Sequence, residues 1–559
     1  MNKLGYMAIV AALPFSVSAQ SAVDAYTLSQ NETRGTARFM AMGGAFTALG
    51  GDLSTLNQNP AGIGVYRGSD VGFTLDVNIM NAKSSGISQG SSWNRTHVDV
   101  NNFGYIGTYN LNNSVMQTFS WGVSYGRIKS FDRQYRGAGM PLASSLSNYI
   151  ALMTDGTDPY RMMFYDKQSE VPDGLNIRAP YNPYRDSRIN WLSILGFSGG
   201  VVNPSVAAEP LPDGTSQTYL TDIYNGLFQH PDNGISGDPT TGVGEFMVQE
   251  RGYVDEYNIN FGGNLANTVY WGLGIGITDL NYEQSTYYSE TLTSANVPVG
   301  DPIDGITEGN CDWELNNWKK ITGTGVNLKL GLIFKPINEF RLGLAVHTPT
   351  WYSLSTAYYG NILFGSEYGF QADQSTDTAD GSWNLTSPWK LMVGAAGVIG
   401  GRGIISVDYE YDAYGNMKTS DGGGDLEWFN QDIKNYFKAS NTLRLGAEFR
   451  VTPQFSLRAG YSYSSTNVKN EVADGAVEVV TVGTNPAYTL NNDINTVSAG
   501  LGYRTGGFYA DFAFVHRNTS STYHAFSSFE DYNGKWIDSP KAKMDFNSNQ
   551  LVFTVGYKF

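Results

Sequence analysis

The feature that most constrains this chain is the alternation of apolar with small or polar residues, which is clearest at its carboxyl terminus. The same period of two recurs along much of the chain, on more and longer segments than a soluble sandwich needs. A closed barrel in lipid requires large apolar residues on its outer face and small or polar residues inside. The pattern therefore predicts an all-β fold, a transmembrane antiparallel β-barrel of about 14 strands. The outward row of the last strand would be Leu551, Phe553, Val555, Tyr557 and Phe559.

The alternation marks fourteen candidate strands, and the connections between them are short and long in strict alternation. Bacterial barrels have an even number of strands, with short turns on one side and long loops on the other. Leu443 and Leu445 would face lipid, leaving Arg444 and Glu448 inside, where a charge in mid-strand is tolerated. The candidate strands are 69–79, 100–111, 117–128, 253–265, 269–282, 322–334, 340–348, 387–399, 403–411, 442–451, 455–464, 495–504, 508–517 and 545–559.

The amino terminus has the composition of a secretory signal peptide. Lys3 precedes a short apolar stretch, and Val17-Ser18-Ala19 offers a cleavage site, so we expect a signal peptide at 1–19 and a mature chain from Gln20. The apolar stretch is shorter than the roughly 20 residues that a membrane helix needs. We therefore expect a multi-pass β-barrel in the outer membrane of a Gram-negative bacterium, with both termini in the periplasm.

Composition agrees with a barrel and excludes some other classes. Charged residues are only 16% of the chain, yet the mean hydropathy is −0.28, as expected when half of each strand faces a polar lumen. The net charge of −16 argues against a nucleic-acid partner. The single cysteine, Cys311, has no partner for a disulfide or a metal site, and we expect no cofactor. Acidic residues between 301 and 314 leave calcium as an open alternative.

Residues 20–68 precede the first predicted strand and do not alternate. Small residues interleaved with Phe39, Met40 and Phe46 indicate short, close-packed helices, for which Asp52 and Ser54 are suitable caps. Because a segment rich in Gly and Ala fits tightly against an inner wall, we expect a small helical hatch inside the lumen. The barrel itself would then occupy residues 69–559.

The order of motifs in this segment resembles that of the FadL/TodX family of outer-membrane transporters for hydrophobic compounds. The family pattern is a Gly-Gly-Ala-Phe-type stretch, an acidic residue and Asn-Pro-Ala-Gly. A hairpin at 331–349 is similar to the family's central hairpin. The resemblance implies a hatch-plugged barrel that captures a hydrophobic small molecule, such as a long-chain fatty acid or an aromatic compound, by its loops. It also implies gating by the hatch and lateral release into lipid. The matching residues are Gly43, Gly44, Ala45, Phe46, Asp52, Asn59, Pro60, Ala61 and Gly62.

The 129–252 connection is far longer than an ordinary barrel loop, and we interpret it as a large extracellular insertion. Its most apolar run is a candidate ligand-capture surface, although the same run could be the core of a loop subdomain. The insertion could equally dock a surface protein, so a scaffold for a secretion or surface complex is the alternative function. We do not expect an enzyme, because only His347 and His516 fall in or at the end of predicted strands, and neither has a Ser or Asp arrangement beside it. The capture candidates are Trp191, Leu192, Ile194, Leu195 and Phe197.

The aromatic carboxyl terminus predicts how the barrel assembles. Tyr557 and Phe559 complete the outward row, and aromatic residues are favoured at the membrane interface. We expect them to act as an assembly signal for the barrel assembly machinery, with the last strand closing against the first. The other expected partners are the hydrophobic ligand and outer-membrane lipid.

Overall fold

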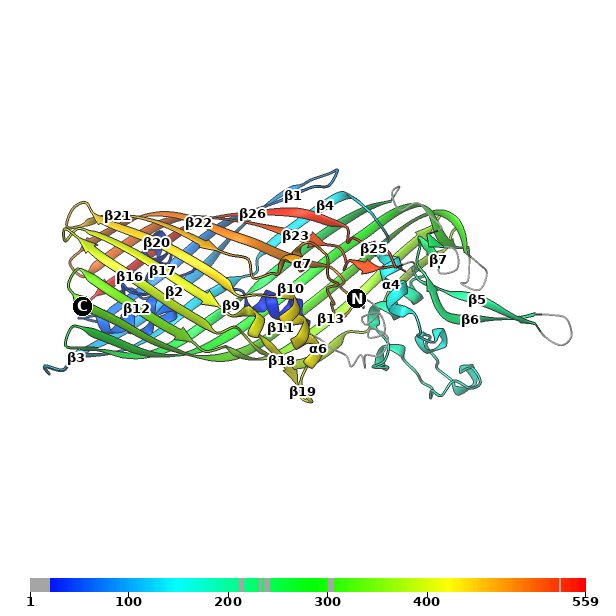
Figure 1. Ribbon diagram of the computed structural model, residues 1–559, viewed down its shortest axis with the longest axis horizontal. Coiled ribbons are helices and arrows are strands. Elements are labelled where there is room, and N and C mark those ends of the chain that lie inside the picture. Colours follow the sequence, from blue (N-terminus) through cyan, green and yellow to red (C-terminus); the bar gives the residue numbers. More distant parts are fainter. Residues whose placement is uncertain (1–20, 211–215, 231–233, 236–241, 300–305, 532–533) are drawn as a thin grey trace.

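The computed structural model describes residues 21–210, 216–230, 234–235, 242–299, 306–531 and 534–559. These residues form a long barrel with short helices inside it and a folded insertion at one end (Figure 1). The predicted signal peptide at 1–19 and the cleavage before Gln20 lie outside the described residues. Within the described ranges, no helix has both the length and the apolar character needed to cross a membrane.

The wall is a single antiparallel sheet that closes on itself, because the last strand pairs with the first from Asp70↔Lys558 to Ser85↔Lys543. The predicted fourteen-stranded barrel is confirmed. At two positions of the wall, two consecutive strands lie end to end and count as one. These are β12 followed by β13, and β15 followed by β16. The wall strands are β1 (Asp70–Ser85), β2 (Ser92–Asn110), β3 (Met116–Ser130), β9 (Val243–Leu265), β10 (Val269–Pro298), β11 (Ile306–Ile337), β12 (Phe340–His347) with β13 (Trp351–Ser366), β15 (Ala379–Thr386) with β16 (Lys390–Ile399), β17 (Gly403–Asp412), β20 (Ser440–Arg450), β21 (Phe455–Ser464), β22 (Tyr488–Thr505), β23 (Phe508–His524) and β26 (Lys541–Lys558).

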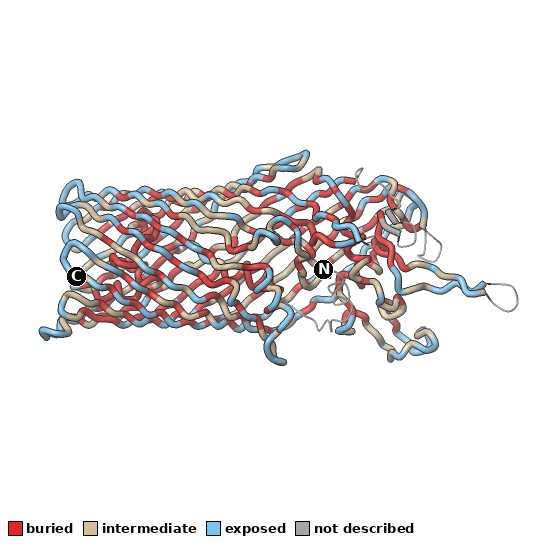
Figure 2. Tube along the Cα trace, in the orientation of Figure 1, coloured by how far each residue is buried: buried red, intermediate tan, exposed pale blue. Residues whose placement is uncertain are grey.

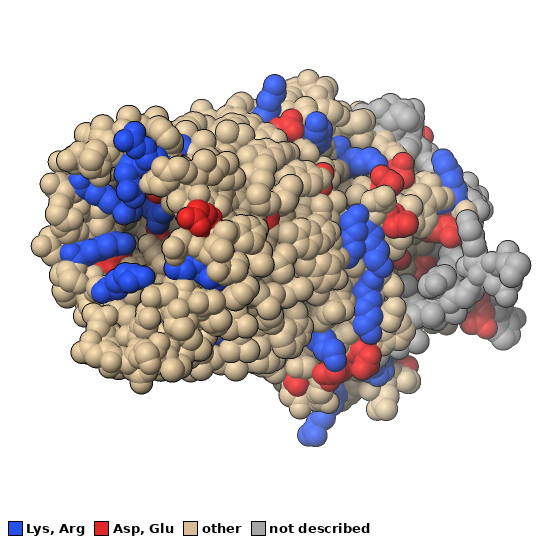
Figure 3. All heavy atoms as spheres, turned by 60° about the vertical axis from the view of Figure 1, so that its left-hand side comes forward, with Lys and Arg blue, Asp and Glu red and all other residues tan. Residues whose placement is uncertain are grey.

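Partway along the longest strands, the apolar residues change from the outer face of the wall to the inner face. In β10, Ile277 is exposed on the outer face, whereas Leu280, three residues later, is buried inside. In β11 the change falls between Ile321, which is buried, and Val326, which is exposed. The half of the barrel that contains Phe559, here called the mouth half, therefore has an apolar exterior, seen as a broad belt with few charged side chains (Figure 3). The far half has the polar exterior and apolar interior of a water-soluble domain.

This inversion explains why the strands are longer than the alternation predicted. β10 has 30 residues and β11 has 32, whereas the expected segments were 269–282 and 322–334. The expected boundaries mark the places where outward apolar residues stop. Beyond them the strands continue as a wall whose apolar residues point inward, so much of the predicted loop sequence is strand.

The 129–252 insertion is partly wall and partly a folded module over the far end. β3 runs to Ser130, and β4 (Arg133–Pro141) pairs with β9. The rest, residues 142–230, is called the distal module, and its apolar core is continuous with the interior of the far half. Its elements are α4 (Leu146–Thr154), η3 (Pro159–Met162), η4 (Gln168–Glu170), η5 (Pro183–Arg185), α5 (Trp191–Ser198), β5 (Asn203–Pro210), β6 (Ser216–Asn225) and β7 (Gln229–His230), and β7 pairs with β8 (Gly234–Ile235).

Shorter elements complete the far half around the same interior. α6 packs beside α1 (Ala22–Ser29) of the hatch, with the rings of Tyr26 and Phe437 stacked at 4.8 Å between centroids. The sheet is extended locally where β14 pairs with β13 and β18 pairs with β15. These elements are β14 (Gln371–Ser375), η7 (Tyr414–Asn416), β18 (Lys418–Asp421), β19 (Gly424–Asp425), α6 (Glu427–Tyr436), α7 (Asn470–Ala473), β24 (Phe529–Glu530) and β25 (Trp536–Ile537).

Four short helices ahead of β1 lie inside the barrel, where the sequence predicted a helical hatch. Buried residues gather inside the mouth half, where most of the hatch lies (Figure 2). Ser21, the first described residue, is buried, and helix α1, which it caps, lies beside α6 of the far half and away from the mouth. The hatch helices are α1 (Ala22–Ser29), α2 (Ala37–Ala41), α3 (Thr55–Gln58) and η2 (Pro60–Val65).

Removal of Phe559 tests the role of the carboxyl terminus in assembly. Its backbone exchanges hydrogen bonds of 3.0 and 2.8 Å with Ser69, and its ring, 63% exposed, lies beside Tyr557 on the outer face. We expect the truncated chain to give less folded barrel in the outer membrane and more periplasmic aggregate, measured by fractionation and heat-modifiable mobility. Phe559→Tyr keeps the ring and should insert normally. Normal insertion of the truncated chain would contradict an assembly role.

Candidate functional site

Gly43 and Gly44 allow the hatch backbone to approach the wall closely. Their φ angles are +62° and +76°, a left-handed region that residues with a Cβ rarely adopt. A Cβ on Gly43 would also lie 3.0 Å from the backbone N and O of Tyr461 on β21. Ala45 and Phe46 follow and are fully buried between this turn and the rest of the hatch. The Gly-Gly-Ala-Phe stretch is therefore a contact between hatch and wall.

Asp52 joins the two halves of the hatch. Its carboxylate accepts hydrogen bonds from the Thr36 hydroxyl at 2.7 Å and from the Ser54 backbone amide at 3.0 Å. Thr36 caps α2, and its own amide donates to the Ser54 hydroxyl at 2.7 Å. Ser54 precedes α3 but makes no side-chain cap there. The acidic residue of the motif thus bridges helices that are far apart in the hatch sequence.

The Asn59-Pro60-Ala61-Gly62 stretch forms a compact corner. Asn59 Oδ1 accepts from the Ala61 amide at 3.1 Å, which caps η2. Pro60 is the first residue of η2, where the missing N–H removes no helical bond. Gly62 packs against Thr55, since a Cβ on Gly62 would lie 2.5 Å from the Thr55 hydroxyl. The corner turns the chain from α3 toward the wall.

The wall carries a matching set of inward glycines, here called the glycine seat. A Cβ on Gly343 would lie 2.1 Å from the Thr47 carbonyl oxygen, and one on Gly331 would lie 1.9 Å from Asn59 Oδ1. Any larger residue at these positions would have to displace the hatch. The alternation predicted that some of these glycines face inward, but no sequence signal connected them with the hatch. The seat includes Gly262, Gly272, Gly331, Gly343, Gly446, Gly460 and Gly500.

Charged side chains of the wall also hold the hatch. Asp408 on β17 accepts a hydrogen bond of 2.7 Å from the Thr47 amide. Arg38 on α2 pairs with Glu448 on β20 at 2.8 Å. Hydrogen bonds to charged groups contribute about 1.5–3 kcal/mol each in typical cases. Release of the hatch therefore requires that these bonds be exchanged for water.

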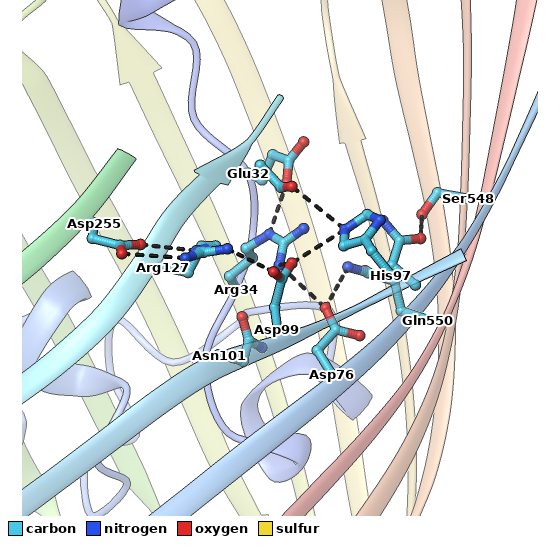
Figure 4. A network of polar contacts seen from close by, with 12 residues as sticks. Glu32, Arg34, Asp76, His97, Asp99, Asn101, Arg127, Asp255, Ser548 and Gln550 are labelled. Atoms are coloured by element: carbon cyan, nitrogen blue, oxygen red, sulfur yellow. Dashed lines mark hydrogen bonds and ion pairs between the residues drawn. The ribbon is translucent and has the colours of Figure 1, made fainter. Parts of the chain in front are cut away.

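The segment between α1 and α2, residues 30–36, is here called the hatch linker, and it enters a buried ionic network (Figure 4). Arg34 lies 2.8 Å from Glu32, 3.2 Å from Asp76 on β1 and 3.4 Å from Asp99 on β2. Arg127 on β3 lies 2.6 Å from Asp99. One guanidinium of the hatch thus contacts two wall strands. Further members of the network are His97, Asp255, Arg517 and Gln550.

The charges in this network stabilise one another. Burial alone would raise the pKa of Glu32, but Arg34 and Arg517 lower it to about 2. Glu32 is therefore ionised at physiological pH, and Arg34 keeps a carboxylate partner on its own segment. Removing one member of a buried ion pair typically costs about 3–5 kcal/mol, because the other charge is left without compensation.

The wall ladder is interrupted between β2 and β3. β2 pairs with β1 from Ser92 to Ile106, but it pairs with β3 only from Asn102 to Asn110. Within the continuously described range 21–210, no backbone pair joins residues 92–101 to residues 127–137. The next backbone pair lies at the β1–β2 turn, between Gln89 and Ala138. Ten strand residues correspond to roughly 30 Å. This interval, with 92–101 on one side and 127–137 on the other, is here called the seam.

Side chains close the seam in place of backbone hydrogen bonds. Arg127 and Asp99 form the inner contact at 2.6 Å, and Arg95 and Asp132 form a second at 2.9 Å. The Arg136 guanidinium lies over the Trp93 ring at 5.4 Å. Contacts of this kind can separate without unfolding a strand.

A β-bulge and the hatch linker lie at the point where the seam begins. Asn101 is the extra residue where the β1–β2 register shifts, and both Asn101 and Asn102 are buried. Asn101 donates to the Gly35 carbonyl at 2.8 Å, and the Glu32 amide donates to the Ile128 carbonyl on β3 at 3.1 Å. The hatch linker is therefore hydrogen-bonded to both sides of the seam.

A cavity of about 260 Å³ lies between the hatch and the wall beside this linker. Its lining is rich in charged and polar side chains, including Arg127, Lys329, His347 and Arg444. Lys129, also on the lining, donates to the Thr27 carbonyl at 3.1 Å and to Gln30 Oε1 at 3.2 Å. Such a space favours water and polar groups over a pure hydrocarbon.

The apolar run of α5 is mostly buried, and its expected role in ligand capture stays a prediction. Trp191 packs against Tyr184 at 4.9 Å and against Tyr358 of β13 at 5.4 Å between ring centroids. The run is apolar because the helix is the core of the distal module, the alternative that the sequence left open. Trp191, Leu192, Ile194 and Leu195 are buried, Phe197 is partly buried, and none lines the cavity.

Metal ligation receives no support from the described residues, which contain no cluster of three or more His, Cys, Asp or Glu suitable for an ion. Asp301 and Asp304, from the acidic run considered for calcium, lie outside the described residues. Cys311 is buried in the apolar interior of the far half.

Structural comparison places the fold. No protein-family model matches the sequence, and a search among curated proteins found no match. A crystal structure of a Pseudomonas aeruginosa FadL homologue is 11% identical, covers 95% of this chain and 99% of its own, and superposes with a TM-score of 0.51. The toluene transporter TodX of Pseudomonas putida is 12% identical, with 94% and 99% coverage and a TM-score of 0.46. The toluene transporter TbuX of Ralstonia pickettii is 11% identical, with 94% and 99% coverage and a TM-score of 0.42.

The chain has the FadL-type fold, as the sequence resemblance implied. This conclusion is carried by the first of these structures together with the fourteen-stranded wall and the internal helices. At this level of identity the likeness concerns the fold, and the function has to be argued from the site.

Gly343→Ala tests the glycine seat. The added Cβ meets the Thr47 carbonyl oxygen, so we expect the hatch to shift and the purified protein to conduct ions more freely in planar bilayers, while heat-modifiable mobility shows a folded barrel. Gly397→Ala on the neighbouring strand β16 is the control, because its Cβ would come no closer than 3.9 Å to the Glu339 carbonyl oxygen. Equal conductance of both variants would show that the hatch does not depend on the seat.

Trp191→Ala tests the core role of α5. Truncation of a buried Trp typically costs about 3–5 kcal/mol, so we expect faster proteolysis of the distal module. Phe164→Ala is the matched control, since Phe164 is an aromatic residue of the same module that is 56% exposed. Reduced binding of a hydrophobic probe by a Trp191 variant with normal protease resistance would support the capture role.

Proposed function

We propose that this chain is an outer-membrane channel for the uptake of hydrophobic small molecules, with the hatch as its gate and the seam as a lateral exit. The observation that carries the proposal is the seam, an interruption of the wall ladder held closed by side chains that the hatch contacts. Unpaired backbone groups cost several kcal/mol each in hydrocarbon. A wall that served only to enclose a lumen would gain stability by completing this ladder.

The outer edge of the seam suits a hydrophobic cargo. Val98 is 63% exposed, and Val100 and Trp93 are also exposed beside it. A molecule that leaves between β2 and β3 meets these apolar side chains and then lipid, so its apolar surface need not cross water. The charged cavity inside favours a compound with a polar head, such as a fatty acid, over a pure hydrocarbon.

The hatch linker supplies the coupling between gate and exit. Arg34 and Arg127 share Asp99, so a displacement of Arg34 changes the charge balance at the inner contact of the seam. The same displacement strains the hydrogen bonds from Asn101 to Gly35 and from Glu32 to Ile128. A ligand that enters the cavity and moves the linker would therefore loosen both sides of the seam together.

The proposed orientation follows from the ends of the barrel. The short turns lie at the mouth and the long insertion lies at the far end, as in bacterial barrels whose short turns face the periplasm. The mouth would then face the periplasm, and the distal module would lie outside the cell. Capture would begin at the far half, whose interior is apolar.

A chemical bridge across the seam tests lateral release. In a Cys311→Ser background, Arg95→Cys with Asp132→Cys would be joined by a short, reducible bifunctional thiol reagent. We expect uptake of a fluorescent fatty-acid analogue to fall about tenfold or more, and to recover on reduction.

The control bridges Leu457→Cys and Leu501→Cys, which lie opposite each other on the fully paired strands β21 and β22. That bridge should leave uptake unchanged, because these strands have no reason to separate. Full uptake by the bridged seam variant would contradict lateral release but not gating by the hatch.

The alternative function, a scaffold for a surface complex, is favoured by one feature. The β5–β6 hairpin projects from the far end (Figure 1), with Val206 and Tyr219 exposed on it. Deletion of residues 203–225 distinguishes the two functions. A channel should retain uptake after the deletion, whereas a scaffold should lose a stoichiometric partner that co-purifies with the full chain.

A further inference from the structure

The mouth of the barrel has an excess of basic side chains, although the whole chain has 36 Lys and Arg against 52 Asp and Glu. Lys and Arg gather in and around the hollow at the end turned toward the viewer in Figure 3. The basic residues of the hatch, strand ends and turns there are Arg38, Arg67, Lys335, Arg341, Arg402, Arg450, Arg504 and Lys558. The carboxylates near them are Asp52, Asp70, Glu339, Glu448 and Asp511.

Part of this basic charge has no counter-ion. Arg38 pairs with Glu448, and Lys558 lies 3.6 Å from Asp70. In the described part of the chain, Arg67, Arg341 and Arg504 form no ion pair with a carboxylate. Arg67 donates to Asn267 Oδ1 at 3.2 Å, and Arg341 Nη1 donates to the Leu49 carbonyl at 2.6 Å. Arg341 Nε is buried without a hydrogen-bond partner.

The cations of the mouth belong to two parts that a gate must separate. Arg38 and Arg67 lie on the hatch segment, whereas Arg341, Arg504 and Lys558 lie on the wall. Arg341 is within electrostatic range of Arg38 and Arg67. Lys558 is within range of Arg38 and Arg504, and also of the carboxylates of Asp70 and Asp52. Like charges held this close repel one another unless an anion lies between them.

We propose that these cations bind a soluble multivalent oxyanion, of the phosphate or polycarboxylate type, which bridges hatch and wall and holds the hatch closed. Guanidinium groups match such oxyanions because they donate two parallel hydrogen bonds. Arg341 shares the inward face of β12 with Gly343 of the seat, so the site opens to the lumen and not to lipid. The anion is therefore a solute of the compartment at the mouth. This site is separate from the uptake route, which begins at the far end.

Binding is tested by calorimetry of the full-length protein in phospholipid-free detergent, with inorganic pyrophosphate and then citrate as probes. We expect saturable binding at low ionic strength that weakens as salt rises. Arg341→Gln with Arg504→Gln should weaken it about tenfold or more, since charge-assisted bonds are lost. Arg178→Gln with Arg185→Gln removes the same charge from exposed positions of the distal module and should leave affinity unchanged.

Three results would overturn the binding site. The first is no binding of either probe, and the second is equal weakening of binding in both double variants. The third is binding that appears only when phosphatidylglycerol vesicles replace the micelles. That third result would assign the cations to a lipid headgroup. None of these measurements depends on uptake. The anion site can therefore be disproved while the proposed channel function stands, and the channel function can be disproved while the anion site stands.

The locking role has its own test. Pyrophosphate added on the mouth side of a planar bilayer should lower the frequency of conductance openings severalfold, and it should have no effect from the far side. The Arg341→Gln and Arg504→Gln double variant should lose this response. Openings that persist at saturating pyrophosphate would show that the anion binds without holding the hatch.

Discussion

Hydrocarbon offers no hydrogen bonds, and this constraint determines how the rest of the molecule is built. In the mouth half it forces apolar side chains outward, as at Ile277 and Val326, and leaves a polar inner face. The lumen of this half is filled by the hatch, which is held by the glycine seat, by charged groups such as Asp408 and by a small apolar cluster between the hatch and the wall. Beyond the apolar band the constraint ends, and the wall reverts to an apolar interior beneath the distal module.

The alternation was sufficient to predict fourteen strands, because every strand that crosses lipid must place its apolar residues on the outer face. It was not sufficient to predict their length. Between Ile277 and Leu280 the apolar residues of β10 change from the outer to the inner face. A strand predicted from outward apolar residues alone therefore ends there. The run from Trp191 to Phe197 shows the opposite difficulty, since an apolar helix has the same composition whether it is a capture surface or a core. Only its neighbours Tyr184 and Tyr358 favour the core role.

The hatch motif could be identified from sequence because its residues are close together, but its partners could not. Gly343 and Gly331 contact Thr47 and Asn59 across nearly three hundred residues, and a glycine in a strand can equally mark a bulge or a bend. One usable signal was glycine at inward positions of successive strands. The seam left a weaker trace, the Asn101 and Asn102 pair, which breaks the alternation where β2 leaves β3. The predicted strand began only at residue 100, so the structure alone shows that 92–101 is strand and that it pairs on one side.

In the proposed gate, buried charge would make opening cooperative. Arg34, Asp99 and Arg127 each have partners on more than one element, so moving one of them leaves another charge uncompensated, at a typical cost of about 3–5 kcal/mol. Partial opening is therefore less favourable than a concerted exchange in which the hatch linker and both sides of the seam change partners together. An apolar plug could slide by small steps, whereas an ionic plug has discrete arrangements. Under the proposed function, a ligand in the cavity would favour one of these arrangements by offering polar contacts of its own, and a polar cavity is then compatible with a cargo that is mostly hydrophobic.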